Sequence, residues 1–121
     1  MTKEELELPE SLRQALDEIV QRIVEIAQPQ AVILFGSFAE GRAREHSDFD
    51  FLVITDAGDP SEIAVELHVA MARMARGHTE IYPPTDFIVL TPEEYEHEAQ
   101  LPGLVVWRAR RHGVTLYGQA A

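Results

Sequence analysis

The fold is decided by the stretch Ala31-Val-Ile-Leu-Phe-Gly-Ser-Phe-Ala-Glu-Gly-Arg-Ala-Arg-Glu-His-Ser-Asp-Phe-Asp-Phe-Leu-Val-Ile54. Two apolar runs rich in β-branched and aromatic residues, 31–35 and 49–54, flank a segment of small and charged residues. Runs of this length and composition are typical of buried strands, whereas the segment between them has the composition of a loop. The stretch therefore predicts a strand, a functional loop and a second strand.

Polar residues stand where each predicted strand meets the loop. Gly36 and Ser37 directly follow the first strand, where a residue without Cβ lets the backbone turn sharply and lets an anion approach its N–H groups. Asp48 and Asp50 are two positions apart at the start of the second strand, so their side chains leave the same face, with Cα atoms roughly 6.5 Å apart. Two carboxylates in this arrangement can share one hard cation.

A family resemblance is carried by the pattern Gly36-Ser37-x3-Gly41-x5-Ser47-Asp48-x-Asp50. It resembles the signature of the DNA polymerase beta-like nucleotidyltransferase superfamily. At this chain length the sequence is similar to the minimal nucleotidyltransferases, which include antitoxin partners of HEPN toxins. A lone Gly-Ser or Asp-x-Asp is a weak signal, but here all of these residues fall in register between two predicted strands.

The resemblance also implies a third carboxylate on a later strand. Asp86, near the start of the run 85–90, stands in such a position. The site residues implied are therefore catalytic and metal-binding Asp48, Asp50 and Asp86, and phosphate-binding Gly36, Ser37 and Ser47. Within this set, the Ser47 hydroxyl is expected to brace the loop through the neighbouring backbone. The positive end of a short helix beginning near Phe38 is expected to add to the phosphate site.

The activity that the resemblance implies is transfer of a nucleoside monophosphate, AMP from ATP, to a hydroxyl of a partner. The cofactor implied is a pair of Mg²⁺ ions, which Mn²⁺ can replace. Toxin-linked members of the family suggest that the partner is a HEPN toxin, with a protein hydroxyl such as that of a tyrosine as the acceptor, so that the chain acts as an antitoxin. The alternative is a binding module that neutralises a partner protein by contact, with a vestigial site.

One departure from the family pattern lies inside the loop. Members often carry arginine between the two glycines, where this chain has Phe-Ala-Glu40. A carboxylate there repels a triphosphate unless it points away, which affects nucleotide affinity rather than the metal site. Arg42, Arg44 and His46 follow in the same loop and are either phosphate contacts or parts of a solvated loop.

Composition limits the function classes. The chain has 121 residues, no cysteine and a net charge of −11, which disfavours a long nucleic acid as the partner but not a nucleotide delivered with Mg²⁺. This length predicts a single domain over 1–121. No apolar run approaches the roughly 20 residues needed to cross a bilayer, and the acidic start does not resemble a signal peptide. We therefore expect a cytoplasmic protein without a membrane partner.

The remaining elements follow from periodicity and turn signals. They are helices at 10–27 and 61–76, a strand at 85–90, a short acidic helix after Thr91, a last helix at 102–113 and a terminal strand at 114–117, with loose tails at 1–8 and 118–121. A right-handed crossover makes 49–54 and 85–90 parallel, whereas the first two strands are antiparallel. The predicted fold is α/β, a mixed sheet of three to four strands packed by helices.

The last helix is also a candidate partner surface. It carries Arg108, Arg110, Arg111 and His112, a basic cluster in an acidic chain, with Trp107 beside them. Cations at a helix C-terminus and a core tryptophan explain the same residues without a partner. The sequence does not determine the acceptor substrate, the nucleobase preference or the oligomeric state.

Overall fold

The computed structural model describes residues 2–44 and 47–119. A 3-10 helix at Lys3–Glu5 precedes the elements α1 (Glu10–Ala27), β1 (Ala31–Phe35), β2 (Phe49–Ile54), α2 (Pro60–Ala75), β3 (Thr85–Leu90), α3 (Pro92–Glu98), α4 (Val105–His112) and β4 (Val114–Gly118). All predicted strands and both long helices are confirmed to within a residue or two at each end.

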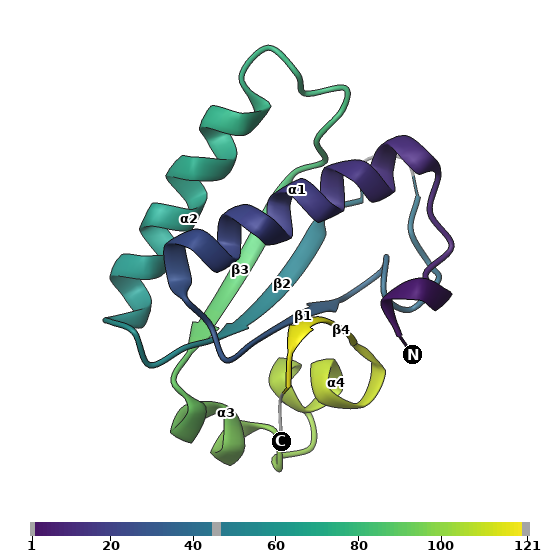
Figure 1. The fold of residues 1–121 in the computed structure, drawn as a ribbon. Coiled ribbons are helices and arrows are strands. Elements are labelled where there is room, and N and C mark those ends of the chain that lie inside the picture. Colours follow the sequence, from purple (N-terminus) through teal and green to yellow (C-terminus); the bar gives the residue numbers. More distant parts are fainter. Residues whose placement is uncertain (1, 45–46, 120–121) are drawn as a thin grey trace.

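The strands form one mixed sheet in the order β3-β2-β1-β4. β1 runs antiparallel to β2 and to β4, whereas β2 and β3 are parallel, as the crossover through α2 requires. Within the part of the chain that the structure describes, this arrangement confirms the predicted α/β fold with a mixed sheet. It also brings the starts of β2 and β3 to the end of β1, where the loop begins (Figure 1).

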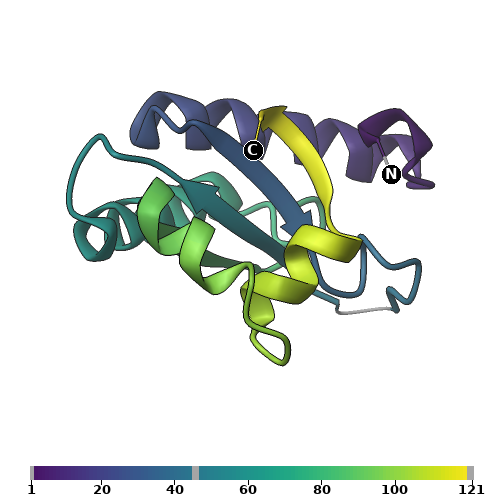
Figure 2. The ribbon, with the colours of Figure 1, turned by 90° about the horizontal axis from the view of Figure 1, so that it is seen from below.

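Helices cover both faces of the sheet. Figures 1 and 2 show α1 and α2 on one face and α3 and α4 on the other. Because successive residues of a strand point to opposite faces, Phe51 packs in the core beneath α1 and α2, whereas Leu52 packs in the core beneath α3 and α4. Both side chains have no exposed surface. The central strand β2 is thus buried on both faces, which holds the residues at its start in a fixed position.

Local signals explain where the helices begin and end. Gln28 has a left-handed backbone, φ 45°, and closes α1. Thr91 and Glu94 form a capping box at the start of α3, the short acidic helix predicted after Thr91. The helix α2 is capped by Asp59, whose carboxylate accepts from the Ser61 N–H at 2.8 Å, so it begins at Pro60, one residue before the predicted start.

Two other predictions differ from the structure. Residues 2–8 are not a loose tail: Leu6 is only 4% exposed and belongs to the core, the Arg13 guanidinium donates to its carbonyl, and Thr2 forms a bridge with Thr115. The last helix begins at Val105 rather than at residue 102. At the other end Gly118 still belongs to β4, while Met1 and residues 120–121 lie outside the described residues.

No helix in the described ranges has both the length and the apolar character needed to span a membrane.

Candidate active site

The three aspartates lie at one end of the sheet because of strand direction and register. Asp50 of β2 is paired directly with Asp86 of β3, and Asp48 is two residues before Asp50. Asp50 also lies opposite Phe35, the last residue of β1, so it is one position from the loop glycine Gly36. The sheet thus brings the predicted metal ligands and the predicted phosphate loop to the same edge.

The electrostatics of Asp50 show that these carboxylates influence one another. Asp50 is half-buried, whereas Asp48 and Asp86 are exposed. Burial raises the pKa of Asp50, and the negative charges of Asp48 and Asp86 raise it further. A cation between the carboxylates would remove both penalties, since it compensates for burial and screens the like charges.

The side chains themselves do not form a ready-made metal cage. Among residues 2–44 and 47–119, no group of three His, Cys, Asp or Glu side chains is arranged to hold a metal ion. Asp86 Oδ1 accepts a hydrogen bond of 3.0 Å from the Phe87 N–H. The donor set nonetheless fits Mg²⁺ in chemical type, because all three side chains offer carboxylate oxygens.

Two features of the structure require glycine at position 36. Its φ is +79°, in the left-handed region that side chains disfavour. A Cβ at this position would also overlap the Asp50 Oδ2 atom. Asp50 therefore lies directly against the first residue of the loop, and an anion bound to the Gly36 backbone would be next to this carboxylate.

The loop that follows is a hydrogen-bonded turn rather than the short helix expected near Phe38. The Glu40 N–H donates to the Gly36 carbonyl at 3.1 Å and the Arg42 N–H donates to the Ser37 carbonyl at 2.8 Å. With only one turn present, there is no helix dipole to bind phosphate, and the backbone N–H groups near Ser37 are the donors that remain.

Packing fixes this turn against the sheet. Ala39 is 1% exposed and belongs to the core. The ring centroids of Phe38 and Phe49 lie 4.7 Å apart, and Phe49 is the residue between Asp48 and Asp50 in the sequence. At the other end of the loop, the Ser47 hydroxyl accepts from the Arg44 N–H at 2.7 Å, and the Ser47 N–H donates to the Arg44 carbonyl at 3.0 Å. Ser47 thus makes the bracing contact that was expected of its hydroxyl.

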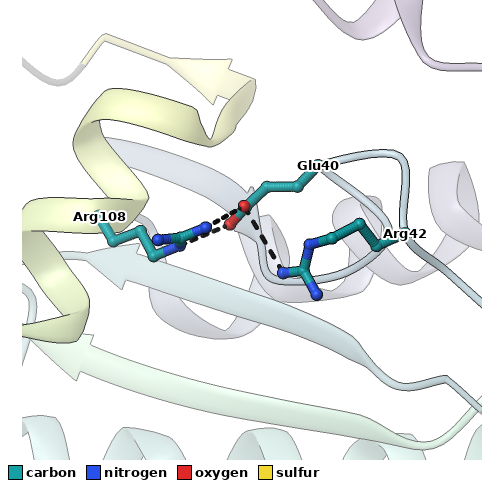
Figure 3. A network of polar contacts seen from close by, with 3 residues as sticks. All are labelled: Glu40, Arg42 and Arg108. Atoms are coloured by element: carbon teal, nitrogen blue, oxygen red, sulfur yellow. Dashed lines mark hydrogen bonds and ion pairs between the residues drawn. The ribbon is translucent and has the colours of Figure 1, made fainter.

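Glu40, the departure from the family pattern, is paired with a cation from α4. Arg108 Nε and Nη2 donate to its two carboxylate oxygens at 3.0 and 2.5 Å, and Arg42 Nη2 lies 3.5 Å from Oε1 (Figure 3). These contacts hold the pKa of Glu40 below its usual value, chiefly through the hydrogen bond from Arg108 and against the opposing effect of burial. The sequence did not indicate that Arg108 neighbours the site. His46, another candidate phosphate contact of this loop, lies outside the described residues.

A groove of about 1100 Å³ lies beside the loop. It is lined by residues 5–9 and Leu12, by loop residues between 38 and 47, by residues 79–81, 83 and 84, and by 111–113 at the end of α4. Ser47 reaches it, but none of the three aspartates does. In the described residues, the carboxylates of Asp48, Asp50 and Asp86 thus lie at one end of the sheet, and the groove lies beside them rather than around them.

The sequence matches the family model of the nucleotidyltransferase domain over residues 13–107. This match spans most of the chain, which therefore belongs to the nucleotidyltransferase domain family. No curated protein matches the sequence.

Solved structures share the fold. A chain in the crystal structure of a toxin–antitoxin with AMP-PNP is 17% identical, with a TM-score of 0.55 over 85% of this chain and 73% of that one. A putative nucleotidyltransferase from Sulfolobus solfataricus is 18% identical, with a TM-score of 0.54 over 89% and 81%. A chain of the toxin–antitoxin MntA-HepT is 16% identical, with a TM-score of 0.52 over 88% and 73%. At such identities the likeness establishes the fold.

Proposed function

We propose that the protein is a Mg²⁺-dependent nucleotidyltransferase that transfers AMP from ATP to a hydroxyl of a partner protein. The observation that carries the proposal is the pairing of Asp50 with Asp86 across parallel strands, with Asp50 in contact with Gly36. Membership of the nucleotidyltransferase domain family supports the reaction class. In this proposal the aspartates are the ligands for cations, and the neighbouring backbone N–H groups at Gly36 and Ser37 are the donors for phosphate.

Asp48, Asp50 and Asp86 are the residues that would hold two Mg²⁺ ions, or Mn²⁺ in their place. Bound there, the ions would supply positive charge to the triphosphate and lower the pKa of the acceptor hydroxyl. The raised pKa of Asp50 supports this assignment, because its causes, burial and like charge, are those that a bound cation offsets.

The loop residues bind and orient the phosphates in this proposal. The backbone N–H groups at Gly36 and Ser37 and the Ser37 hydroxyl contact the β- and γ-phosphates, while Ser47 keeps the loop closed through its bonds to Arg44. A bond then forms between the acceptor oxygen and the α-phosphorus, the α–β phosphoanhydride bond breaks and pyrophosphate leaves. The hydroxyl proton passes to water.

The partner is proposed to be a toxin of the HEPN type, with this chain as its antitoxin. Support comes from the structural neighbours, among them chains of toxin–antitoxin crystal structures, one of which was solved with AMP-PNP. A small domain with its carboxylate edge exposed can present the nucleotide to a side chain of another protein.

The test is a label-transfer assay with the partner protein, using ATP labelled on the α-phosphate or on the γ-phosphate. We expect label from the α-phosphate, none from the γ-phosphate, and loss of transfer when EDTA removes divalent cations. Label from the γ-phosphate would instead show phosphoryl transfer. Neutralisation of the partner without any label would favour the binding-module alternative.

A further inference from the structure

The ion pair between Glu40 and Arg108 joins two parts of the molecule that are far apart in sequence. Glu40 lies in the glycine–serine loop and Arg108 lies on α4, 68 positions later. Both guanidinium contacts go to the carboxylate, one to each oxygen, which is the bidentate geometry that gives such pairs direction as well as strength (Figure 3).

The two partners differ in how firmly they are placed. The Glu40 side chain is only 13% exposed, and its backbone is fixed by the turn and by buried Ala39. The Arg108 side chain is 58% exposed, but its helix is anchored on β1 through buried Val106 and Ala109. Glu40 therefore cannot easily turn to solvent, and Arg108 is held where it meets the carboxylate.

Charge gives this contact a consequence for nucleotide binding. Alone, Glu40 would place a negative charge in the loop that is proposed to receive a triphosphate, and like charges repel. With Arg108 and Arg42 both at Glu40 Oε1, the three side chains together carry a net charge of +1. The loop is thus made compatible with an anion by a residue of α4.

We propose that Arg108 is a positioning residue for the nucleotide: it neutralises Glu40 and so lets the Gly36–Ser37 loop accept the triphosphate. This inference rests on the proposed function, because it concerns the same phosphate site. It adds a specific contribution of α4, which otherwise covers the far face of the sheet from α1.

The experiment titrates the full chain with ATP in the presence of Mg²⁺, and separately with inorganic tripolyphosphate, by calorimetry. We expect Arg108→Gln to weaken binding of both about fivefold, since Glu40 is then opposed only by the more distant Arg42. Arg108→Lys keeps the positive charge and should retain most of the affinity. The matched control is Arg110→Gln, which makes the same change in net charge on the same helix and should bind as the wild type does.

The decisive variant is the double change Glu40→Gln with Arg108→Gln. If neutralisation is the role of Arg108, the double variant recovers to within about twofold of the wild type, because the repelling charge is gone. Salt should also shrink the deficit of Arg108→Gln, since ions screen the repulsion. A purely structural bridge would leave the double variant at least as weak as the single one, at every salt concentration.

The outcomes separate this inference from the proposed function. If Arg108→Gln binds ATP as tightly as the wild type does, the inference is overturned but the proposed function is not. The same holds if the double variant does not recover the ATP affinity of the wild type. A wild type that binds neither ligand contradicts the proposed function, and the inference falls with it. Thermal unfolding of each variant confirms that the compared proteins are folded.

Discussion

Replacing Asp50 by asparagine should stabilise the metal-free protein. Asp50 and Asp86 are paired on neighbouring strands, and burial and the charges of Asp48 and Asp86 raise the Asp50 pKa. The amide removes one of these mutually repelling charges and is less costly to bury. A gain in stability at a residue proposed to be essential is the behaviour expected of a functional carboxylate cluster rather than of a structural one.

The size of the effect follows from the strand geometry. Paired residues of neighbouring strands lie about 4.8 Å apart, so their carboxylate charges are roughly 6 Å apart. Coulomb's law then gives roughly 0.7 kcal/mol at a dielectric constant of 80 and about 2.8 kcal/mol at 20. Because Asp86 is exposed, solvent screening favours the lower part of this range, about 1 kcal/mol. For a domain of this size that is an increase in Tm of about 4 °C.

The stability gained by replacing Asp50 with asparagine should depend on pH. Folding raises the pKa of Asp50 above its usual value of 3.8, so the folded state binds this proton more tightly than the unfolded state does. The destabilisation by Asp50 is therefore complete above the raised pKa and disappears as the pH falls through it toward the usual value. The advantage of Asp50→Asn over the wild type should be full at pH 7 and lost near pH 3.8.

The assay is thermal unfolding by circular dichroism in buffer containing EDTA, with and without excess Mg²⁺. The control is Asp56→Asn, which removes the same charge beyond the other end of β2. Mg²⁺ should raise the Tm of the wild type and leave Asp50→Asn unchanged, which narrows the difference between them. If Asp50→Asn is less stable than the wild type in EDTA at pH 7, the reasoning on charge repulsion is refuted.

Other predictions concern the loop, the N-terminal segment and α4. Gly36→Ala should lower the free energy of unfolding by about 1–3 kcal/mol in urea titrations, because of its positive φ and the overlap with Asp50; unchanged stability would contradict that geometry. Leu6→Ala should cost about 2–4 kcal/mol in the same assay, whereas a loose tail would show no loss. The double variant Arg110→Glu with Arg111→Glu should reduce co-purification with the partner at physiological salt, and undiminished recovery would exclude α4 as a docking surface.

The elements of the fold could be predicted because their signals are local. Apolar runs rich in β-branched and aromatic residues placed the strands, and the 3.6-residue period placed α1 and α2. The grouping of Asp48, Asp50 and Asp86 at one end also followed from sequence, because parallel strands joined by a crossover start at the same edge. Both inferences depend only on local sequence patterns and on the direction in which each strand runs, and they need no knowledge of side-chain contacts.

The features that sequence reasoning missed depend on tertiary contacts. Nothing in the local pattern links Glu40 with Arg108, because the two residues are 68 positions apart and both are common on surfaces. Leu6 and Leu8 are only two apolar residues in a short acidic segment, so no periodicity indicates that Leu6 enters the core. The loop after Gly36 was expected to begin a helix, but its backbone closes after one turn, with buried Ala39 holding it to the sheet.

The division of labour between the carboxylates tests the central claim most directly. Asp50→Asn should lose Mg²⁺-dependent ATP binding and transfer together, because the remaining carboxylates hold the ion too weakly against water. Asp86→Asn should keep much of the binding, measured by calorimetry, but reduce transfer of α-phosphate label to the partner at least about a hundredfold, a barrier increase of roughly 2.7 kcal/mol. Undiminished transfer by Asp86→Asn, or equal loss of ATP binding in both variants, would contradict this account.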